Sequence, residues 1–512
     1  MRSIFERHDR YTFEAKINYI LDTRQPKNKY FLTFYFFIPK QLNLTRKSYS
    51  RTDFYADTHT YIRFRNPRFT LEELLDKYNP RSPLCRIAAN INDLRQNPSS
   101  PEINHKIIYE LRMFGTIFKA FLKTQVINFI KTIRQEPKTA AKDLDRELDK
   151  FIAGLRELLR QSENLGKDID LPNISRELQE TRNFARDLLS LEVQNHLTLL
   201  LEVYRKKYRK ASKKTMDSLI ALIEAHLFFR KSRNSHLIRD SETMNENFTY
   251  WEGILKKYFQ GVLYLTIQDR DTAGKAQHLF YAVAAGVAMF LSVMLGYWIG
   301  TRFTSEQSTS FIIAIVVAYM IKDRAKDIIR AYSNTLLGRL FPDHSFVIKD
   351  QLTKKNIGTV KESMHFILPQ DIPEQVMQER SSGHMTRTEE EGKPEDVLVY
   401  QKSVTLDTRK ISRWHTRQRD IDEIIRFNVR KMVQYADDSF HFDTVWDPRI
   451  KKTKKIKCAK VYHLNLIIRL ETLADQSRRK LPLSVNQEKK QIIFKHVRVI
   501  LNQDGIARMA EV

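Results

Sequence analysis

The sequence predicts an α+β multidomain integral membrane protein. We expect an N-terminal small sheet plus helical bundle, a central two-helix transmembrane hairpin and a C-terminal β-rich domain. Three observations predict this class: two charge-free apolar runs near the middle, helical periodicity before them, and strand-like alternation towards both ends. With 512 residues, the chain is also too long for a single hydrophobic core, so several structural units are expected.

The expected segments begin and end where the periodicity of the apolar residues changes. They are a small β segment, a cytoplasmic helical bundle, a transmembrane helical hairpin, a juxtamembrane helix and a cytoplasmic β-rich domain that contains a disordered loop. Their ranges are, in that order, 1–69, 70–270, 277–323, 324–342 and 343–512, with the loop near 380–396.

The soluble parts follow from local patterns. Residues 13–19 alternate apolar and polar side chains, as a half-buried strand does, and the apolar run 30–38 follows. Helical periodicity begins at Thr70, which with Glu73 forms the pattern of a capping box. Towards the C-terminus strand patterns return, interrupted by one expected helix over residues 417–436.

Two apolar runs predict the membrane hairpin. Residues 279–300 carry no charge and, at about 1.5 Å per residue, can cross a hydrocarbon layer of roughly 30 Å. The second run is shorter and becomes a span only if it extends over about 305–321. Lysine and arginine flank both runs, whereas the loop between them offers only Arg302. Both termini are therefore expected in the cytoplasm, in a bacterial inner membrane.

Small residues recur every four positions along the first run and would allow a second helix to approach closely. They are Ala284, Ala288, Ser292, Gly296 and Gly300. Packing against the second run of the same chain is the simpler expectation, and a homodimer is the alternative. No ionisable side chain lies within residues 279–300 or 308–321, and Glu306 in the extension of the second run can lie at the interface, which disfavours a transporter.

Composition limits the partners more than the chemistry. The chain has 87 Lys and Arg against 61 Asp and Glu, a net charge of +26, which favours a polyanionic partner. It has two cysteines, Cys85 and Cys458, without the spacing of a metal site or a disulfide framework. Motifs for nucleotide phosphates, zinc proteases and serine hydrolases are absent, and no cofactor is expected.

One ionisable stretch supplies the weak catalytic candidates. The residues are His415, Asp437, Asp438 and His441. Carboxylates and an imidazole suit a hard metal ion, but Asp-Asp-Ser after a helix is also ordinary turn chemistry. The structural interpretation is favoured here over a metal or catalytic site.

Two basic clusters can contact phosphate groups. The expected anionic-lipid contacts are Arg205, Lys206, Lys207, Arg209, Lys210, Lys213, Lys214, Lys451, Lys452, Lys454 and Lys455. A solvated surface is the alternative, and nucleic acid is less favoured because the chain lacks a recognisable reading helix, aromatic RNA motif or zinc finger.

Two functions fit these observations. The first is a membrane-anchored scaffold or regulatory protein with large basic cytoplasmic domains, which brings an unidentified protein partner or anionic lipid headgroups to the β-rich domain. The alternative is a membrane-tethered enzyme of unrecognised family that acts on a lipid or a nucleotide.

Overall fold

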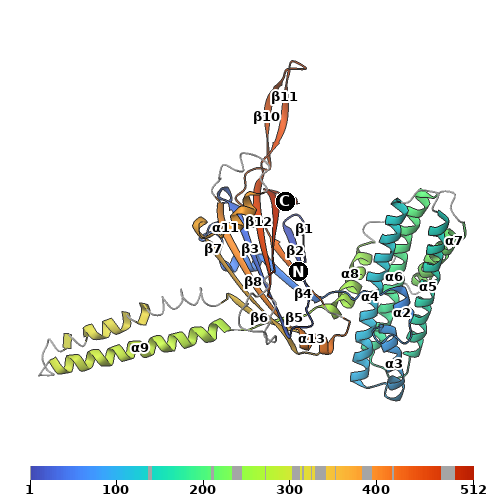
Figure 1. Cartoon of the computed structure of the whole chain (residues 1–512), viewed down its shortest axis with the longest axis horizontal. Coiled ribbons are helices and arrows are strands. Elements are labelled where there is room, and N and C mark those ends of the chain that lie inside the picture. The colour runs from blue at the N-terminus through green and yellow to red at the C-terminus, as the bar shows by residue number, and fades with distance from the viewer. Residues whose placement is uncertain are drawn as a thin grey trace, which may run out of the picture. The chain divides into compact units, whose positions relative to one another are not determined.

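A computed structural model of the chain describes residues 2–135, 141–208, 213–232, 245–270, 272–302, 312–313, 316–324, 326–328, 342–351, 353–382, 395–417, 420–473 and 491–512 (Figure 1). These residues form an α+β protein of helices and antiparallel sheets. They divide into a sheet unit, formed by Met1–Ile62, Leu265–Trp414 and Asp420–Val512, and a helical unit, formed by Arg63–Tyr264 and His415–Arg419.

The described strands form three sheets. The largest has eight strands in the order β14 (Gly505–Glu511), β13 (Gln491–Asn502), β12 (Tyr462–Leu473), β3 (Lys27–Pro39), β8 (Glu395–Asp407), β7 (Asn356–Ile367), β6 (His344–Lys349) and β5 (Thr266–Asp269). A four-stranded sheet has the order β1 (Arg2–Arg7), β2 (Thr12–Tyr19), β9 (Ile421–Asn428) and β4 (Thr58–Phe64). Strands β10 (Phe440–Asp447) and β11 (Lys452–Ala459) form a separate hairpin.

The N-terminal strands do not form the independent sheet expected for residues 1–69. Strand β3 lies between β8 and β12, and β2 pairs with β9, so segments from both ends of the chain build each sheet. The physical reason is the composition of β3, whose second half is buried on both faces. Such a strand needs neighbours along both edges and a cover on both faces, which a segment of this length cannot supply alone.

The two larger sheets enclose an aromatic core. Phe427 of β9 meets Phe13 at a ring-centroid distance of 5.2 Å and Phe34 at 5.5 Å. Helix α1 (Arg51–Asp57) adds Phe54, which lies 5.1 Å from Tyr400 of β8. Large side chains from both sheets therefore fill the space between them, as close packing requires.

The two sheets also meet along their edges. The backbone N–H of Leu265, just before β5, donates to the carbonyl of Ile62 in β4 at 2.9 Å. At the opposite edge, the Arg7 guanidinium of β1 donates to the carbonyl of Ala507 in β14 at 3.5 Å. These contacts give the sheet unit a bounded interior, in which the candidate site lies.

The outer face of the large sheet is covered by helix α11 (Glu374–Ser381). Val376 of α11 is buried in a cluster that includes Tyr35, Phe37, Val399 and Ile467. Burial of these side chains stabilises the sheet because apolar surface contributes about 25 cal/mol per Å² removed from water. Helix α13 (Thr408–Trp414) follows directly after β8.

The helical unit agrees with the periodicity of the sequence. Its described helices are α2 (Leu71–Leu75), α3 (Pro83–Gln96), α4 (Pro101–Gln135), α5 (Ala141–Asp168), α6 (Arg176–Lys207), α7 (Lys213–Ser232) and α8 (Glu246–Gln260). Thr70 and Glu73 form the expected capping box at the start of α2. Leu188 of α6 and Phe259 of α8 belong to the buried core between these helices.

One expected helix is wrong. We expected residues 417–436 to be helical, but residues 421–428 form strand β9. Ile421, Glu423, Ile425 and Phe427 are buried in strict alternation, which is a period of two. The stretch also has apolar residues at helical spacing, and strand pairing with β2 decides between the two periods.

Helix α9 (Thr272–Arg302) contains the first apolar run. Over Tyr281–Thr301 it is the one helix, among the described residues, that is long and apolar enough to cross a membrane. The second run falls partly outside the described residues, as do most of the expected juxtamembrane helix, 324–342, and most of the expected disordered loop near 380–396. The ends of that loop belong to α11 and β8.

The small-residue row of α9 is only partly covered. Ala288 is buried and Ser292 is half-buried, whereas Gly296 and Gly300 are exposed, and the side chain of Ala284 lies outside the described residues. A row of every fourth residue turns by about 40° per step relative to a straight face of the helix. The covered face instead continues through Leu295 and Ile299, so the two glycines leave it.

Candidate functional site

A buried ion cluster lies in the interior of the sheet unit. Lys402 of β8 stands directly opposite Glu362 of β7, and its Nζ is 2.7 Å from Glu362 Oε1. The same Nζ is 2.5 Å from Glu423 Oε1 of β9, so the lysine joins the two facing sheets. The Lys402 side chain is 0% exposed, and the Tyr19 hydroxyl of β2 donates to Glu423. Each charge is therefore paired, as buried charges must be.

The surroundings of Lys402 keep it protonated. Burial alone would lower the pKa of Lys402, but the negative charges of Glu362 and Glu423 outweigh burial, and the pKa is raised. Burial, together with the charge of Glu423, raises the pKa of Tyr19 well above its ordinary value. Lys402 is thus neither a nucleophile nor a general base, because both roles need a neutral amine.

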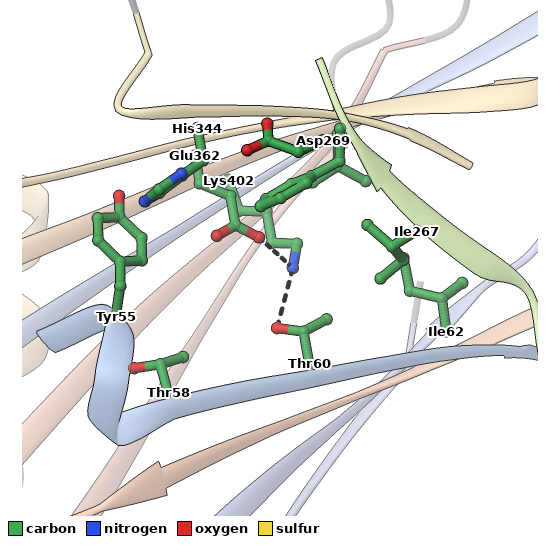
Figure 2. Close-up of a pocket in the computed structure, with 11 residues that line it drawn as sticks. Tyr55, Thr58, Thr60, Ile62, Ile267, Asp269, His344, Glu362 and Lys402 are labelled. Carbon is green, nitrogen blue, oxygen red and sulfur yellow. Dashed lines mark hydrogen bonds and ion pairs between the residues drawn. The ribbon is translucent and has the colours of Figure 1, made fainter. Parts of the chain in front are cut away.

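Two members of this cluster, Glu362 and Lys402, line a pocket of about 410 Å³ (Figure 2). Figure 2 shows the Lys402 ammonium pointing towards Thr60 of β4, and its Nζ lies 3.4 Å from Thr60 Oγ1. The pocket is lined by Tyr55, Thr58, Thr60, Ile62, Ile267, Asp269, His344, Phe346, Val360, Glu362 and Lys402. Strands from both large sheets and helix α1 therefore contribute to one concave surface.

The wall next to α1 is held in place by Asp343. Its carboxylate accepts a hydrogen bond from the Tyr55 hydroxyl at 3.0 Å and one from Arg51 Nη1 at 2.8 Å. The ring of His344 meets the ring of Tyr55 edge-on, with the centroids 4.4 Å apart. Burial and the charge of Asp343 raise the pKa of Tyr55, which therefore remains a hydrogen-bond donor.

The charges of the pocket decide what it can accept. Glu362 and Asp269 line it together with a single ammonium group, that of Lys402, which Glu362 and Glu423 already neutralise. Carboxylates repel phosphate groups, whereas aromatic rings beside carboxylates suit a ligand with a positive charge. The acidic lining therefore disfavours a ligand that carries a phosphate group.

The hairpin of β10 and β11 differs from the rest of the sheet unit. Each of its strands pairs only with the other among the described strands, and nearly all of its residues are exposed (Figure 1). Side chains of directly paired residues point to the same face of the hairpin, and side chains alternate between the two faces along each strand. The register therefore assigns every residue to one of two faces. One is the aromatic–lysine face, which consists of Phe440, Phe442, Trp446, Lys455 and Lys457.

The aromatic–lysine face is apolar and basic. Phe442 is 60% exposed and Trp446 is 58% exposed, although both are large apolar residues. Lys457 Nζ lies 3.7 Å from the centroid of the Phe440 ring, a cation–π contact. The acidic residues of the two strands, Asp443 and Asp447, lie on the opposite face. This surface can therefore attract anionic groups without local repulsion.

The structure places the expected lipid contacts among residues 451–455 on different faces of the hairpin. Lys455 lies on the aromatic–lysine face, Lys452 and Lys454 lie on the opposite face, and Lys451 occupies a left-handed turn position with φ of 47°. Lys457 belongs to the same basic cluster of the sequence but was not among the specific lipid contacts expected. The alternation of residues 440–446 was the signal that could have identified the more favourable face, because it fixes which lysines accompany the aromatic rings.

In the helical unit, the expected basic contacts have several different neighbours. Lys206 pairs with Glu202 at 2.6 Å, and Lys207 donates to the carbonyl of Ile133. Arg209 and Lys210 lie outside the described residues. Arg205 is in the last turn of α6, and Lys213 and Lys214 begin α7. Part of this positive charge is thus engaged within the chain.

The four weak catalytic candidates have separate surroundings. His415 is buried in the helical unit, with its ring 4.5 Å from that of Phe64. Asp437 lies 3.8 Å from Lys460 Nζ, whereas His441 Nε2 is 3.1 Å from Asp443 Oδ2 on β10. Asp438 is exposed. His441 acquires a partner from across the hairpin, Cys458, which sequence spacing did not indicate.

Sequence reasoning also missed the ion cluster. Its three charged members are residues 362, 402 and 423, and each occupies a buried position of a strand whose other buried positions are mainly apolar. A charged residue at an inward position of an alternating strand was the available signal.

The fold and these sites define an α+β protein with a buried ion cluster and an exposed basic hairpin. Comparison with protein-family models, with curated proteins and with solved structures finds no match for the chain.

Proposed function

We propose that the chain is a membrane-anchored scaffold or regulatory protein, which presents its basic sheet unit to anionic lipid headgroups and to a protein partner. The observation that carries this proposal is the exposed apolar surface of helix α9. Only 12% of the most apolar part of this helix is buried. Met289 and Tyr297 are 63% and 74% exposed. Apolar surface of this extent is unfavourable in water and favourable in a bilayer.

Two spans anchor the chain in this proposal. The second run contributes residues that also face outward, such as Ile313, Val316 and Met320. Ala288 of α9 and Ala318 of the second run are each buried among these exposed neighbours, which supports packing of the two runs against each other. The flanking lysines and arginines support an orientation with both termini in the cytoplasm, in a bacterial inner membrane.

The hairpin of β10 and β11 provides the second contact with the membrane. Its aromatic–lysine face combines rings that suit the headgroup layer with two lysines, each of which gains roughly 1 kcal/mol near an anionic surface. The excess of positive charge over the whole chain acts in the same direction.

The alternative, a membrane-tethered enzyme that acts on a lipid or a nucleotide, has less support. The weak catalytic candidates lie in separate surroundings: His415 contacts Phe64, Asp437 lies near Lys460, and His441 lies near Asp443. Lys402 stays protonated. The acidic lining of the pocket also disfavours a nucleotide phosphate.

Topology tests the anchor. A reporter that is active only in the cytoplasm is fused at the N-terminus, at the C-terminus and after Ser305. We expect activity at both termini and none at Ser305, because the positively charged flanks remain inside. An insertion after Glu390 is the control and should be active. Activity after Ser305, with the control active, contradicts the two-span anchor.

A further inference from the structure

Three metal-binding side chains meet on the hairpin of β10 and β11, on the face opposite to the aromatic–lysine face. His441 and Cys458 are direct partners across the two strands, and Asp443 is two residues after His441. One ligand atom from each lies within 4.8 Å of the other two. The sequence alone separates Cys458 from the other two, and only the antiparallel register brings it to them.

The distances suit a small tetrahedral ion. Asp443 Oδ2 lies 3.1 Å from His441 Nε2 and 3.4 Å from Cys458 Sγ. Metal–ligand bonds of about 2.0 to 2.3 Å place the ligands of a tetrahedral zinc ion roughly 3.3 to 3.7 Å apart. The two distances to Asp443 are therefore close to this arrangement, and the ligand atoms of His441 and Cys458 lie within 4.8 Å of each other.

The kinds of donor atom select the ion. A thiolate and an imidazole favour Zn²⁺ over Mg²⁺ or Ca²⁺, which prefer oxygen ligands only, and a carboxylate is a normal third zinc ligand. Two negative charges and a neutral imidazole also match a divalent cation. A fourth position stays open to water or to a group from a bound partner.

A bound ion would also stabilise the hairpin. An isolated two-stranded hairpin is only marginally stable in water, and β10 and β11 have no third strand among the described residues. An ion held by His441 and Asp443 on one strand and by Cys458 on the other joins the two strands. It would fix the twist of the hairpin and thereby the orientation of Phe442 and Trp446 on the other face.

We propose that His441, Asp443 and Cys458 form a Zn²⁺ site that clamps β10 to β11. Binding releases the thiol proton of Cys458 to solvent and replaces the hydrogen bond from its Sγ to Asp443 with bonds to the metal. This site does not depend on the membrane anchor, since all three ligands belong to the hairpin.

Cobalt spectroscopy tests the site directly. The full chain, purified in detergent with a histidine-free tag and stripped of metal, is titrated with Co²⁺. We expect a thiolate-to-cobalt charge-transfer band that saturates at one ion per chain and disappears on addition of Zn²⁺. The band should be lost in Cys458→Ser and retained in Cys85→Ser, the matched control. No band in the unmodified chain, or an unchanged band in Cys458→Ser, overturns the proposal.

Alkylation supplies a second readout without cobalt. At a free Zn²⁺ concentration about nine times the dissociation constant, the site is about 90% occupied, so alkylation of Cys458 should slow about tenfold. Cys85 should react at an unchanged rate. His441→Ala should abolish the protection, and it leaves the thiol in place. Equal rates for Cys458 with and without zinc contradict the site.

Discussion

Lysine occurs in two opposite environments within the sheet unit. Lys402 is fully buried, and its ammonium group contacts Glu362 and Glu423. The lysines of the β10–β11 hairpin are exposed, and Lys455 and Lys457 face the same way as exposed aromatic rings. The number of strands around a lysine therefore decides its role in this protein. Enclosed between two sheets it stabilises the fold, and on an isolated hairpin it is available to a partner.

The largest expected effect comes from removal of the buried ammonium group. Lys402→Met leaves Glu362 and Glu423 buried without their partner, which should lower the free energy of unfolding by about 3 to 5 kcal/mol. Amide hydrogen exchange in β7, β8 and β9 should then accelerate by about a hundredfold or more. The matched control is Lys455→Met, which changes an exposed side chain and should alter stability by less than about 0.5 kcal/mol.

A triple variant sharpens this test. Lys402→Met combined with Glu362→Gln and Glu423→Gln removes the unpaired charges and should recover part of the lost protection. Equal exchange rates in Lys402→Met and Lys455→Met would show that the cluster does not hold the two sheets together.

Alkaline pH should destabilise the buried cluster. The pKa of Lys402 is raised above 10.5, and that of Tyr19 well above 10.0, so the folded state keeps protons that the unfolded chain loses. This contribution is complete below the unfolded pKa values and is lost as the pH rises beyond them. Stability should therefore fall above about pH 10, as thermal unfolding would measure. If the loss of stability above about pH 10 is unchanged in Lys402→Met and in Tyr19→Phe, it does not originate from these two groups.

The smallest expected effect concerns the hairpin. The full chain is reconstituted in liposomes with or without anionic lipid, and hydrogen exchange of residues 440–459 is followed. Anionic lipid should slow exchange, and Lys455→Ala with Lys457→Ala should weaken this contact by roughly 2 kcal/mol. The matched control, Lys452→Ala with Lys454→Ala, removes the same charge from the opposite face and should have less effect. Equal losses in both pairs would exclude an oriented aromatic–lysine face.

The contrast between β9 and β10 explains where prediction from sequence failed. Both strands alternate, yet β9 is buried at every second residue and β10 is exposed throughout. Residues 421–428 also fit a helix, so local spacing could not identify the strand. Its partner β2 lies about four hundred positions away, and no local pattern reports such a pairing.

The candidate sites show the same limit. The hairpin lysines could be found from sequence because charge clusters are local, but their division between two faces needed the register. The Lys402 cluster joins strands that are far apart in the chain, and the meeting of His441, Asp443 and Cys458 joins the two strands of one hairpin. Side chains from separate strands converge only after the sheets form.

The sequence by itself determined the α+β composition, the apolar run of α9, the helical unit with its capping box at Thr70, and the basic character of the protein. These features depend on neighbouring residues, whose spacing and charge act locally. The tertiary structure alone decided that the N-terminal strands belong to the C-terminal sheets, that Lys402 is enclosed and that Cys458 meets His441. The first two depend on long-range strand pairing, which is selected by burial of whole faces, whereas the meeting of Cys458 with His441 depends on the register of one hairpin.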